Sequence, residues 1–380
     1  MPRRLMFIVA DRLSQLVAKG EITAGYYNPG DFFDEVHLLT TTNDRVDPAS
    51  LQATAGSARL FVHSLWTGSD LLNTMLTPLL EREWVRRATR LASRIQPDLI
   101  RSGDRLTGYL GARIRQRLRI PHIVSLHSHR DDQCARLSWG PHRVLLEFEK
   151  RYHRFALSAA DAVVIVYQSL MDYAVTYGAR RIECIYNVIS PQSRQPKQHY
   201  GLSTPAKIIS VGRQIPGKVP DQLILAMKQV DGHLHLVGDG PAHPYLRSLV
   251  HEHGLEDRVE FTSTLENEQL CAQLPDYDLF AVHSNYPGIP KAIMEALWLG
   301  LPVVVNEDQS AAVPEFEGQW LMRVNNGADG YAHGLNALLQ DDDGRRRLGR
   351  EGRAYAAATF DPQVMEQRMV ELYGELVGGR

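Results

Sequence analysis

One stretch in the C-terminal third of the chain combines groups that bind anions with a group that binds hydroxyls. Residues 284–300 read SNYPGIPKAIMEALWLG, a turn with glycine and two prolines that leads into a predicted helix carrying Glu295. Free backbone N–H groups and the positive end of the helix dipole meet at a helix start, so a phosphate binds there without a special side chain. A carboxylate one turn further in can hold sugar hydroxyls. The stretch therefore predicts an anion-and-hydroxyl site.

Two cations follow a predicted strand earlier in the same half of the chain. Residues 211–218 read VGRQIPGK and place Arg213 and Lys218 five residues apart, with Gly212 letting the backbone turn close to a ligand. Ligands of parallel sheets bind beyond the carboxyl ends of the strands, where such a pair can neutralise a departing pyrophosphate. Taken alone, the pair also fits a solvated surface loop.

The next predicted strand ends in VGDGP at residues 237–241, with Gly238 at the turn. This is not a dinucleotide-binding fingerprint, because His243 stands where a third glycine is required.

Histidines and aspartates gather after a predicted strand in the first half. Residues 126–132 read LHSHRDD and place His127 at a strand end. Metal binding is disfavoured, because His122 and His127 are an odd number of residues apart and a strand points them to opposite faces. A structural role for His127 stays open. The acidic triplet 341–343 is expected to be a solvated helix start.

Short β-branched runs alternate with helical patterns along the whole chain, which is typical of parallel α/β units. A polar stretch with prolines at 191 and 196 interrupts the series. We therefore expect two tandem Rossmann-like doubly wound domains facing across a cleft, at 1–190 and 204–360, with a linker at 191–203. A helix at 361–380 is expected to pack back on the first domain. The strands are predicted at residues 5–10, 35–39, 60–62, 98–100, 122–126, 162–166, 183–186, 207–211, 234–237, 259–262, 279–282, 302–305 and 320–324.

Composition indicates a globular protein without a spanning helix or a signal peptide. Charged residues make up 23% of the 380 residues, and no apolar run approaches the ~20 residues that a bilayer requires. Three widely spaced cysteines suit a reducing cytoplasm and offer no disulfide or zinc pattern. We therefore expect a cytoplasmic protein without a metal or another cofactor.

The charge is unevenly distributed between the two halves. Residues 1–190 carry 25 Lys and Arg against 19 Asp and Glu, whereas residues 191–380 carry 17 against 25. Arg86, Arg90 and Arg94 recur every four residues, so they share one face of a predicted helix. Such a face is either simply solvated or meets anionic lipid or an acidic acceptor, which would place the protein at the inner membrane face. No nucleic acid partner is expected.

Together these motifs resemble the donor domain of GT-B fold glycosyltransferases, in the large retaining family numbered four that is also described as glycosyl transferases group 1. The resemblance covers residues 205–375 well and continues more loosely through 159–164 and 185–187. The motifs that carry it, in chain order, are GR at 212–213 with Lys218, LVGDGP at 236–241, GLEDRVEF at 254–261, DLFAVHS at 278–284, Gly288 to Ala296, and GLPVV at 300–304.

The resemblance implies roles for the residues already singled out. Arg213 and Lys218 would bind the donor diphosphate and stabilise the leaving group, and His127 would be the active-site histidine facing the donor sugar. Glu295 matches the second glutamate of the family's E-x7-E motif and would take the ribose hydroxyls. The remaining positions implied in donor binding are Gly20 after the first strand, Gly212, Gly238, Gly288, Ile289, Pro290 and Lys291.

One departure from the family pattern lies in the same motif. Eight residues before Glu295 the family has a glutamate that holds the donor sugar, and this chain has Pro287. Proline offers neither a side-chain acceptor nor a backbone N–H. Asn285, Tyr286 or Lys291 is left to contact the sugar.

We therefore expect a metal-independent hexosyltransferase that moves a sugar from a UDP- or GDP-sugar to a hydroxyl of a glycan, lipid-linked or small-molecule acceptor, with retention of configuration. Pro287 keeps two alternatives open, a non-catalytic subunit that binds nucleotide-sugar or glycan, and a GT-B sugar-nucleotide epimerase. An ordinary dehydrogenase is disfavoured by the incomplete glycine fingerprint.

Overall fold

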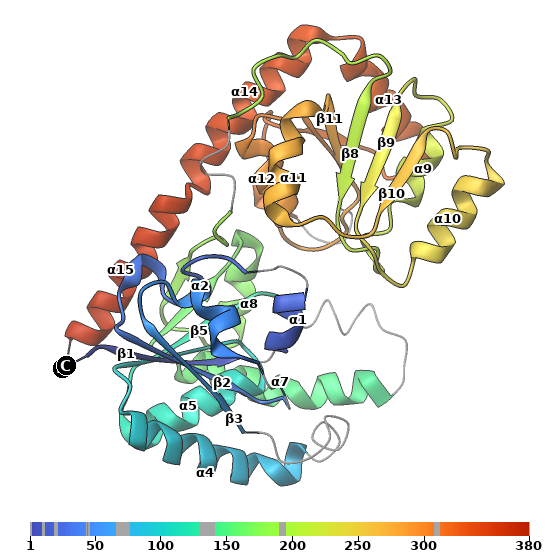
Figure 1. Ribbon diagram of the computed structural model, residues 1–380. Helices are drawn as coiled ribbons and strands as arrows, with labels where there is room; N and C mark the ends of the chain where they lie inside the picture. Colours follow the sequence, from blue (N-terminus) through green and yellow to red (C-terminus); the bar gives the residue numbers. More distant parts are fainter. Residues whose placement is uncertain are drawn as a thin grey trace. The chain divides into compact units, whose positions relative to one another are not determined.

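The chain folds into two α/β units, each built on a fully parallel sheet. The computed structural model describes all residues except 1, 10–11, 19–21, 43, 45, 66–76, 130–140, 190–194, 308–311 and 380, and the side chains of 77–80 and 141–148. Unit 1 contains Met1–Tyr186 and Gln363–Arg380, and unit 2 contains Asn187–Pro362. The expectation of two doubly wound α/β domains is thereby confirmed (Figure 1).

The sheet of unit 1 has seven strands in the order β3-β2-β1-β4-β5-β6-β7. Every neighbouring pair is parallel. The chain order turns back next to β1, so the loops after β1 and β4 begin on the two sides of a switch point. The strands are β1 (Arg4–Val9), β2 (Glu35–Thr40), β3 (Arg59–Ser64), β4 (Leu99–Ser102), β5 (His122–Leu126), β6 (Ala162–Ile165) and β7 (Ile182–Cys184).

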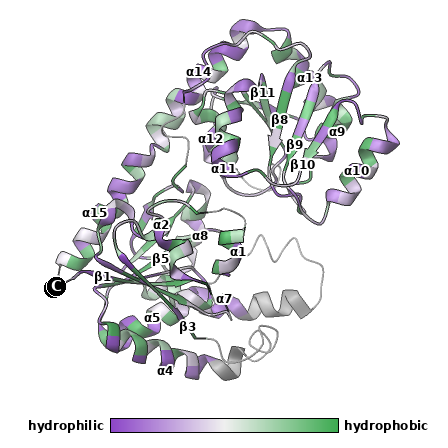
Figure 2. Cartoon of the chain, viewed as in Figure 1, coloured by the Kyte–Doolittle hydropathy of each residue, from purple (hydrophilic) through white to green (hydrophobic). Residues whose placement is uncertain are grey.

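Long helices cover one face of this sheet. Trp84, Val85 and Ala88 of α4 (Thr77–Ile95) pack with Leu110 of α5 (Leu106–Leu118) and Met6 of β1. Helix α4 carries purple and green segments in Figure 2, as expected for an amphipathic helix with one face on the sheet. The other helices of unit 1 are α1 (Leu13–Ala18), α2 (Gln52–Ala55), α7 (Pro141–Ala159) and α8 (Met171–Thr176).

The C-terminal helix α15 (Pro362–Gly378) belongs to unit 1. Tyr373 is buried and its hydroxyl accepts a hydrogen bond from Nη1 of Arg101 at 2.8 Å. Arg101 is itself buried on β4, donates through Nε to Ser125, and lies over the ring of Phe7. A guanidinium so far from water needs these partners, because an unpaired buried charge is costly. The last helix therefore closes the core of a sheet that begins more than 350 residues earlier.

Unit 2 has six parallel strands in the order β10-β9-β8-β11-β12-β13. The order reverses between β8 and β11, so the loops after these two strands leave the sheet at its switch point. The strands are β8 (Lys207–Val211), β9 (His233–Val237), β10 (Val259–Thr262), β11 (Leu279–Val282), β12 (Val303–Asn306) and β13 (Met322–Val324).

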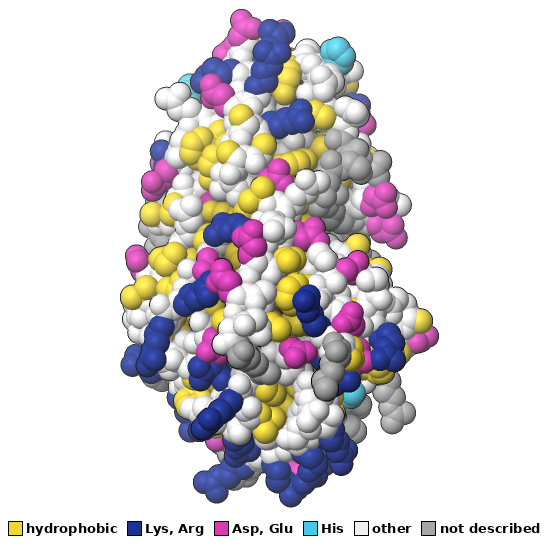
Figure 3. Space-filling view, turned by 90° about the vertical axis from the view of Figure 1, so that its left-hand side faces the viewer, with side chains coloured by type: hydrophobic (Ala, Val, Ile, Leu, Met, Phe, Trp, Pro, Cys, Tyr) yellow, Lys and Arg dark blue, Asp and Glu magenta, His cyan; other side chains and the backbone are white. Residues whose placement is uncertain are grey.

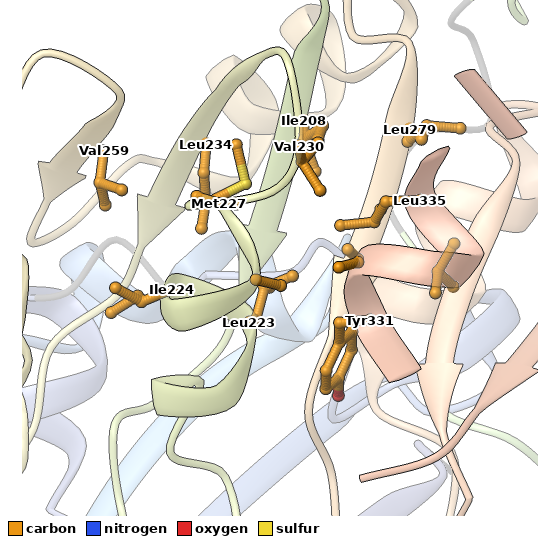
Figure 4. Packing of buried hydrophobic residues seen from close by; sticks show 14 of the residues in the cluster. Ile208, Leu223, Ile224, Met227, Val230, Leu234, Val259, Leu279, Tyr331 and Leu335 are labelled. Carbon is orange, nitrogen blue, oxygen red and sulfur yellow. The ribbon is translucent and has the colours of Figure 1, made fainter. Parts of the chain in front are cut away.

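The core of unit 2 lies between its sheet and residues of α9, α10, α13 and α14. Figure 4 shows Ile208, Leu234 and Leu279 of the strands facing Leu223 of α9 and Leu335 of α13. Alternate residues of each strand point to this layer, as the period of two requires. The helices of unit 2 are α9 (Asp221–Ala226), α10 (His243–Glu252), α11 (Asn267–Gln273), α12 (Lys291–Trp298), α13 (Ala328–Leu339) and α14 (Asp342–Thr359).

Residues 197–203, which the sequence assigns to a linker, pack on unit 2. The ammonium group of Lys197 donates to the carbonyls of Pro275 and Tyr277, and the hydroxyl of Tyr200 donates to the carbonyl of Gly300. Polarity and proline content gave no sign of these contacts. The division between the units falls at Tyr186 and Asn187, slightly before the expected position.

The buried contact between Tyr373 and Arg101 leads to a stability prediction. Tyr373→Phe leaves a guanidinium N–H without its partner in the core, so we expect a loss of about 1–3 kcal/mol in the free energy of unfolding. Urea denaturation of the full chain measures it. Tyr245→Phe is the matched control, because Tyr245 is 52% exposed. Equal unfolding midpoints for the two variants would contradict the role given to Tyr373.

Candidate nucleotide and phosphate site

The loop after β8 carries the two predicted cations at the switch point of unit 2. Arg213 is exposed, whereas Lys218 is half-buried. The ammonium group of Lys218 lies over the ring of Tyr286, 4.6 Å from its centroid. Burial, and to a lesser degree the charge of Arg213, lowers the pKa of Lys218 to about 8. The loop therefore holds two neighbouring positive charges, one of them poorly hydrated, and such an arrangement favours binding of an anion.

Backbone hydrogen bonds fix this loop to the turn after β9. The N–H of Gly212 donates to the carbonyl of Val237 at 3.0 Å, and that of Gln214 donates to the carbonyl of Asp239 at 2.9 Å. Gln214 is buried and its amide also donates to the carbonyl of Gly238. Sequence reasoning missed Gln214, since a lone glutamine in a glycine-rich loop carries no recognisable signal.

Gly238 permits the close approach of the two loops. A Cβ atom at this position would lie 2.1 Å from the carbonyl oxygen of Gly212, and its φ of 137° is one that other residues avoid. Gly212, in contrast, has open space where a Cβ would be. The close contact between the two backbones thus explains why residue 238 is glycine, while the missing side chain of Gly212 leaves open space beside the cations.

The loop after β11 reaches the same place. The N–H of Asn285 donates to the carbonyl of Gly217 at 2.8 Å, and this bond joins the stretch before α12 to the cation-bearing loop. Ser284 lies at the start of the stretch, where its N–H donates to Oδ1 of Asn306 at 2.7 Å. The side-chain amide of Asn306 in turn donates to Oδ1 of Asn285 and of Asn326. Asn306 thereby ties the ends of β11, β12 and β13 together.

A small hollow lies between the ends of β8, β9 and β11. Lys218 and Ser284 both line it, and the hydroxyl oxygen of Ser284 is fully buried there without a hydrogen-bond partner. A buried polar atom in this state indicates a place for a ligand group or an ordered water. The lining is completed by Ser210, Val211, Gly212, Gln214, Pro220, Leu236, Val237, Val282, His283 and Pro290.

Helix α12 begins at this hollow. Lys291 is its first residue and Pro290 its N-terminal flanking residue, whose side chain makes no capping hydrogen bond. Gly288 and Ile289 are buried in the preceding turn. The helix start therefore presents backbone N–H groups without a side-chain cap close to the loop that carries Lys218 and Arg213.

Glu295 stands one turn into α12 and is almost completely buried. Its Oε1 accepts a hydrogen bond from Nδ2 of Asn267 at 3.0 Å, and Nζ of Lys291 lies 3.8 Å from the same oxygen. Asn267 begins α11 and was not singled out from the sequence, because its contact with Glu295 spans 28 residues.

The remaining predicted residues lie in unit 1 or outside the described residues. His127 is exposed directly after β5, and its backbone carbonyl accepts a hydrogen bond from the hydroxyl of Tyr167 at 3.2 Å. His122 is buried within β5 and bonds Ser102 through Nε2, so it is separated from His127 by the length of the strand. Gly20 lies outside the described residues.

Two further expectations concern metals and membranes. Asp341 caps α14 by accepting a hydrogen bond from the N–H of Gly344, which confirms the helix start predicted for the acidic triplet. Within the described part of the chain, no group of three or more His, Cys, Asp or Glu side chains could hold a metal ion. The helices described here include none that is long and apolar enough to cross a membrane.

Comparison with known protein families assigns the two halves of the chain separately. Residues 34–193 match the model described as Glycosyltransferase Family 4, and residues 192–355 match the model described as Glycosyl transferases group 1. Together the two matches cover residues 34–355.

Curated relatives carry compatible descriptions. An uncharacterised glycosyltransferase of Bacillus subtilis is 24% identical over 292 residues, covering 73% of this chain and 77% of the relative. An alpha-D-kanosaminyltransferase of Streptomyces kanamyceticus is 25% identical over 300 residues, covering 70% and 73%. A putative colanic acid biosynthesis glycosyltransferase of Escherichia coli is 31% identical over 186 residues, covering 45% of each chain.

Solved structures with the same fold match over essentially the whole chain. A sucrose-phosphate synthase of Thermosynechococcus elongatus has a TM-score of 0.73 at 19% identity and 100% coverage of both chains. An Anabaena protein in complex with UDP-glucose has a TM-score of 0.70 at 18% identity, with 98% of this chain and 99% of that one covered. At these identities the likeness concerns the fold alone.

Proposed function

Because the chain is a glycosyltransferase of the GT-B type, with a family-four domain followed by a group 1 domain, we propose that unit 2 binds a UDP- or GDP-sugar and that the sugar is transferred to an acceptor hydroxyl with retention of configuration. One observation carries the proposal. The loops after β8 and β11 bring Lys218 and Pro290, which stands at the uncapped start of α12, to one hollow. Arg213 stands on the same loop as Lys218, and Glu295 lies one turn further along the helix.

This arrangement suits a nucleoside diphosphate better than a single phosphate. Arg213 and Lys218 supply two positive charges, and the helix start adds the partial charge of its N–H groups. A departing diphosphate gains negative charge as the bond to the sugar breaks, so preorganised cations stabilise the transition state more than the ground state. In this proposal these groups act where other enzymes use a metal ion, and the reaction is metal-independent.

His127 is the residue of unit 1 that we propose to face the reacting sugar. Its exposed side chain at the carboxyl end of β5 stands where ligands of parallel sheets bind. The acceptor is proposed to be a glycan, lipid-linked or small-molecule hydroxyl. The Anabaena neighbour in complex with UDP-glucose and the Streptomyces kanosaminyltransferase support a nucleotide-sugar donor and a hexose-like sugar.

The donor sugar is proposed to be contacted differently from the family pattern. Pro287 is buried and has neither a polar side chain nor a backbone N–H, whereas Tyr286 is half-buried and already packs on Lys218. Tyr286 is thus the neighbouring side chain best placed to present a polar tip and an aromatic face to the sugar.

Arg213→Ala tests the leaving-group site. Removal of one preorganised electrostatic stabiliser is expected to lower kcat by roughly 10²–10³-fold. A thermal-shift panel of UDP-, GDP- and dTDP-sugars first identifies the donor, and transfer is then measured with that donor. Arg247→Ala, on the exposed face of α10, serves as the control. Wild-type turnover in Arg213→Ala would refute the assignment, and binding without any transfer or hydrolysis would favour a non-catalytic binding protein.

The lowered pKa of Lys218 makes nucleotide binding dependent on pH. In the free protein Lys218 loses its proton as the pH rises through about 8, whereas a bound diphosphate favours the protonated form. The association constant for UDP or GDP is therefore expected to fall above pH 8, by up to about tenfold per pH unit. Calorimetry between pH 7 and 9.5 measures it. The arginine of Lys218→Arg keeps its charge in this range, so the association constant of this variant should depend less on pH. Identical pH profiles for the variant and the unchanged protein would exclude titration of Lys218 as the cause of the pH dependence.

We also propose peripheral contact of unit 1 with an anionic membrane surface. Arg82, Arg86, Arg87, Arg90 and Arg94 of α4 are exposed, and among the acids of this helix Glu83 pairs with Arg86 and Arg87. Figure 3 shows dark blue side chains gathered at its lower end, where Figure 1 places α4 and α5.

Each arginine near an anionic membrane surface contributes about 1 kcal/mol to the free energy of membrane binding. The triple change of Arg86, Arg90 and Arg94 to Gln is expected to weaken binding to vesicles rich in phosphatidylglycerol by roughly 100-fold. Co-sedimentation with these vesicles and with neutral phosphatidylcholine vesicles measures it. Equal binding to both kinds of vesicle, or no binding by the unchanged protein, would refute this contact.

A further inference from the structure

The carboxylate of Glu295 is engaged before any ligand arrives. Its side chain is 2% exposed, and one oxygen has both an amide donor from Asn267 and the ammonium group of Lys291 nearby. The side chain of Lys291 is 37% exposed, so this cation reaches from the buried carboxylate toward solvent. A buried carboxylate needs such compensation, because an unpaired charge away from water is strongly destabilising.

Local helix energetics do not explain a lysine at this position. Lys291 is the first residue of α12, where the helix dipole disfavours a cation by about 0.3–1 kcal/mol. The pair also has the poorer orientation for an i,i+4 contact, since the lysine precedes the glutamate. Lys291 breaks these local rules while it neutralises a buried carboxylate, and residues that break a local rule are expected at functional sites.

The surroundings of Lys291 indicate that the ligand is an anion. Pro290, directly before it, lines the same hollow as Lys218, and the unpartnered hydroxyl of Ser284 is buried in this hollow. With Arg213 on the same loop as Lys218, positive charge accumulates around the helix start. An anion placed there would gain contacts from several of these groups at once.

We propose that Lys291 neutralises Glu295 in the ligand-free protein and moves to the diphosphate when the donor binds, so that ribose hydroxyls replace it at the carboxylate. Asn267 acts as a positioning residue that holds the carboxylate in place during this exchange. The inference rests on the proposed function, because it assigns the two ends of a nucleoside diphosphate to one site.

The exchange makes the site selective for ligands that carry both groups. A nucleoside alone has to displace Lys291 from Glu295 and offers the ammonium group no anion in return. A pyrophosphate alone draws Lys291 away and leaves the buried carboxylate of Glu295 without this cation. A nucleoside diphosphate satisfies both charges at once, so its binding exceeds what its two parts would achieve separately.

Lys291→Met tests the exchange, because it removes the charge and keeps most of the stem. UDP and GDP, each with its parent nucleoside, are measured by calorimetry, or by competition where the nucleoside binds weakly. We expect the variant to bind the diphosphate about tenfold more weakly, the loss of one charge-assisted contact. It should bind the nucleoside as tightly as the unchanged protein or more tightly, since no cation has to be displaced. Lys228→Met, an exposed lysine of unit 2, is the control and should change neither affinity.

The outcomes separate this inference from the proposed function. If the unchanged protein binds neither UDP nor GDP, the nucleotide-sugar assignment fails. Suppose instead that it binds one of them, and that Lys291→Met lowers the affinities for diphosphate and nucleoside equally or changes neither affinity. The proposed exchange is then wrong, while the nucleotide-sugar assignment stands.

Asn267→Ala supplies an independent measurement of the positioning role. In the unchanged protein, replacing the ribonucleotide by its 2′-deoxy analogue is expected to weaken binding. In Asn267→Ala this difference should shrink, because the carboxylate is no longer held toward the ribose. A difference that stays the same, with an unfolding midpoint near that of the unchanged protein, would show that Asn267 does not position Glu295.

Discussion

The reversal of strand order between β8 and β11 is the constraint on which the rest of unit 2 depends. All six strands are parallel, so every loop that follows a strand leaves at the same edge of the sheet. At the reversal, the loops after β8 and β11 leave the sheet next to each other, are joined by the hydrogen bond from Asn285 to Gly217, and both line the hollow. The charged candidate residues of unit 2 stand at this edge: Arg213 and Lys218 on the loop after β8, and Lys291 and Glu295 on α12, the helix that follows the loop after β11.

Burial then changes what these residues can do. The ammonium group of Lys218 is partly removed from water by the ring of Tyr286 and its pKa falls, whereas Arg213, a few residues away, is exposed. Glu295 is more deeply buried and is kept in place by an amide from a different helix. The site thus holds charges that the fold has partly desolvated, and an anionic ligand gains more from such charges than from fully hydrated ones.

Tight backbone packing holds the loops of unit 2 at the required spacing. Gly238 is needed because any side chain would collide with the carbonyl of Gly212. Gln214 and Asn306 act as buried connectors: Gln214 bonds to groups that follow β9, and Asn306 bonds to groups that follow β11 and β13. Loops fixed in this way are preorganised, so less conformational entropy is lost when a ligand binds. In unit 1 the comparable role belongs to Arg101, which joins two strands to the C-terminal helix.

The fold class and the approximate centres of the thirteen strands in the described part of the chain could be predicted from the sequence, because each strand is a short apolar run between helical patterns and such a signal is local. It also identified Arg213, Lys218 and Glu295 as candidates, since their positions relative to predicted strand ends and helix starts are local too. Three contacts became apparent only from the folded chain: Asn267 contacts Glu295, Tyr286 covers Lys218, and residues 197–203 pack on unit 2. These contacts join residues tens of positions apart in the chain. They depend on which strands are neighbours in the sheet, and no local pattern of residues records that order.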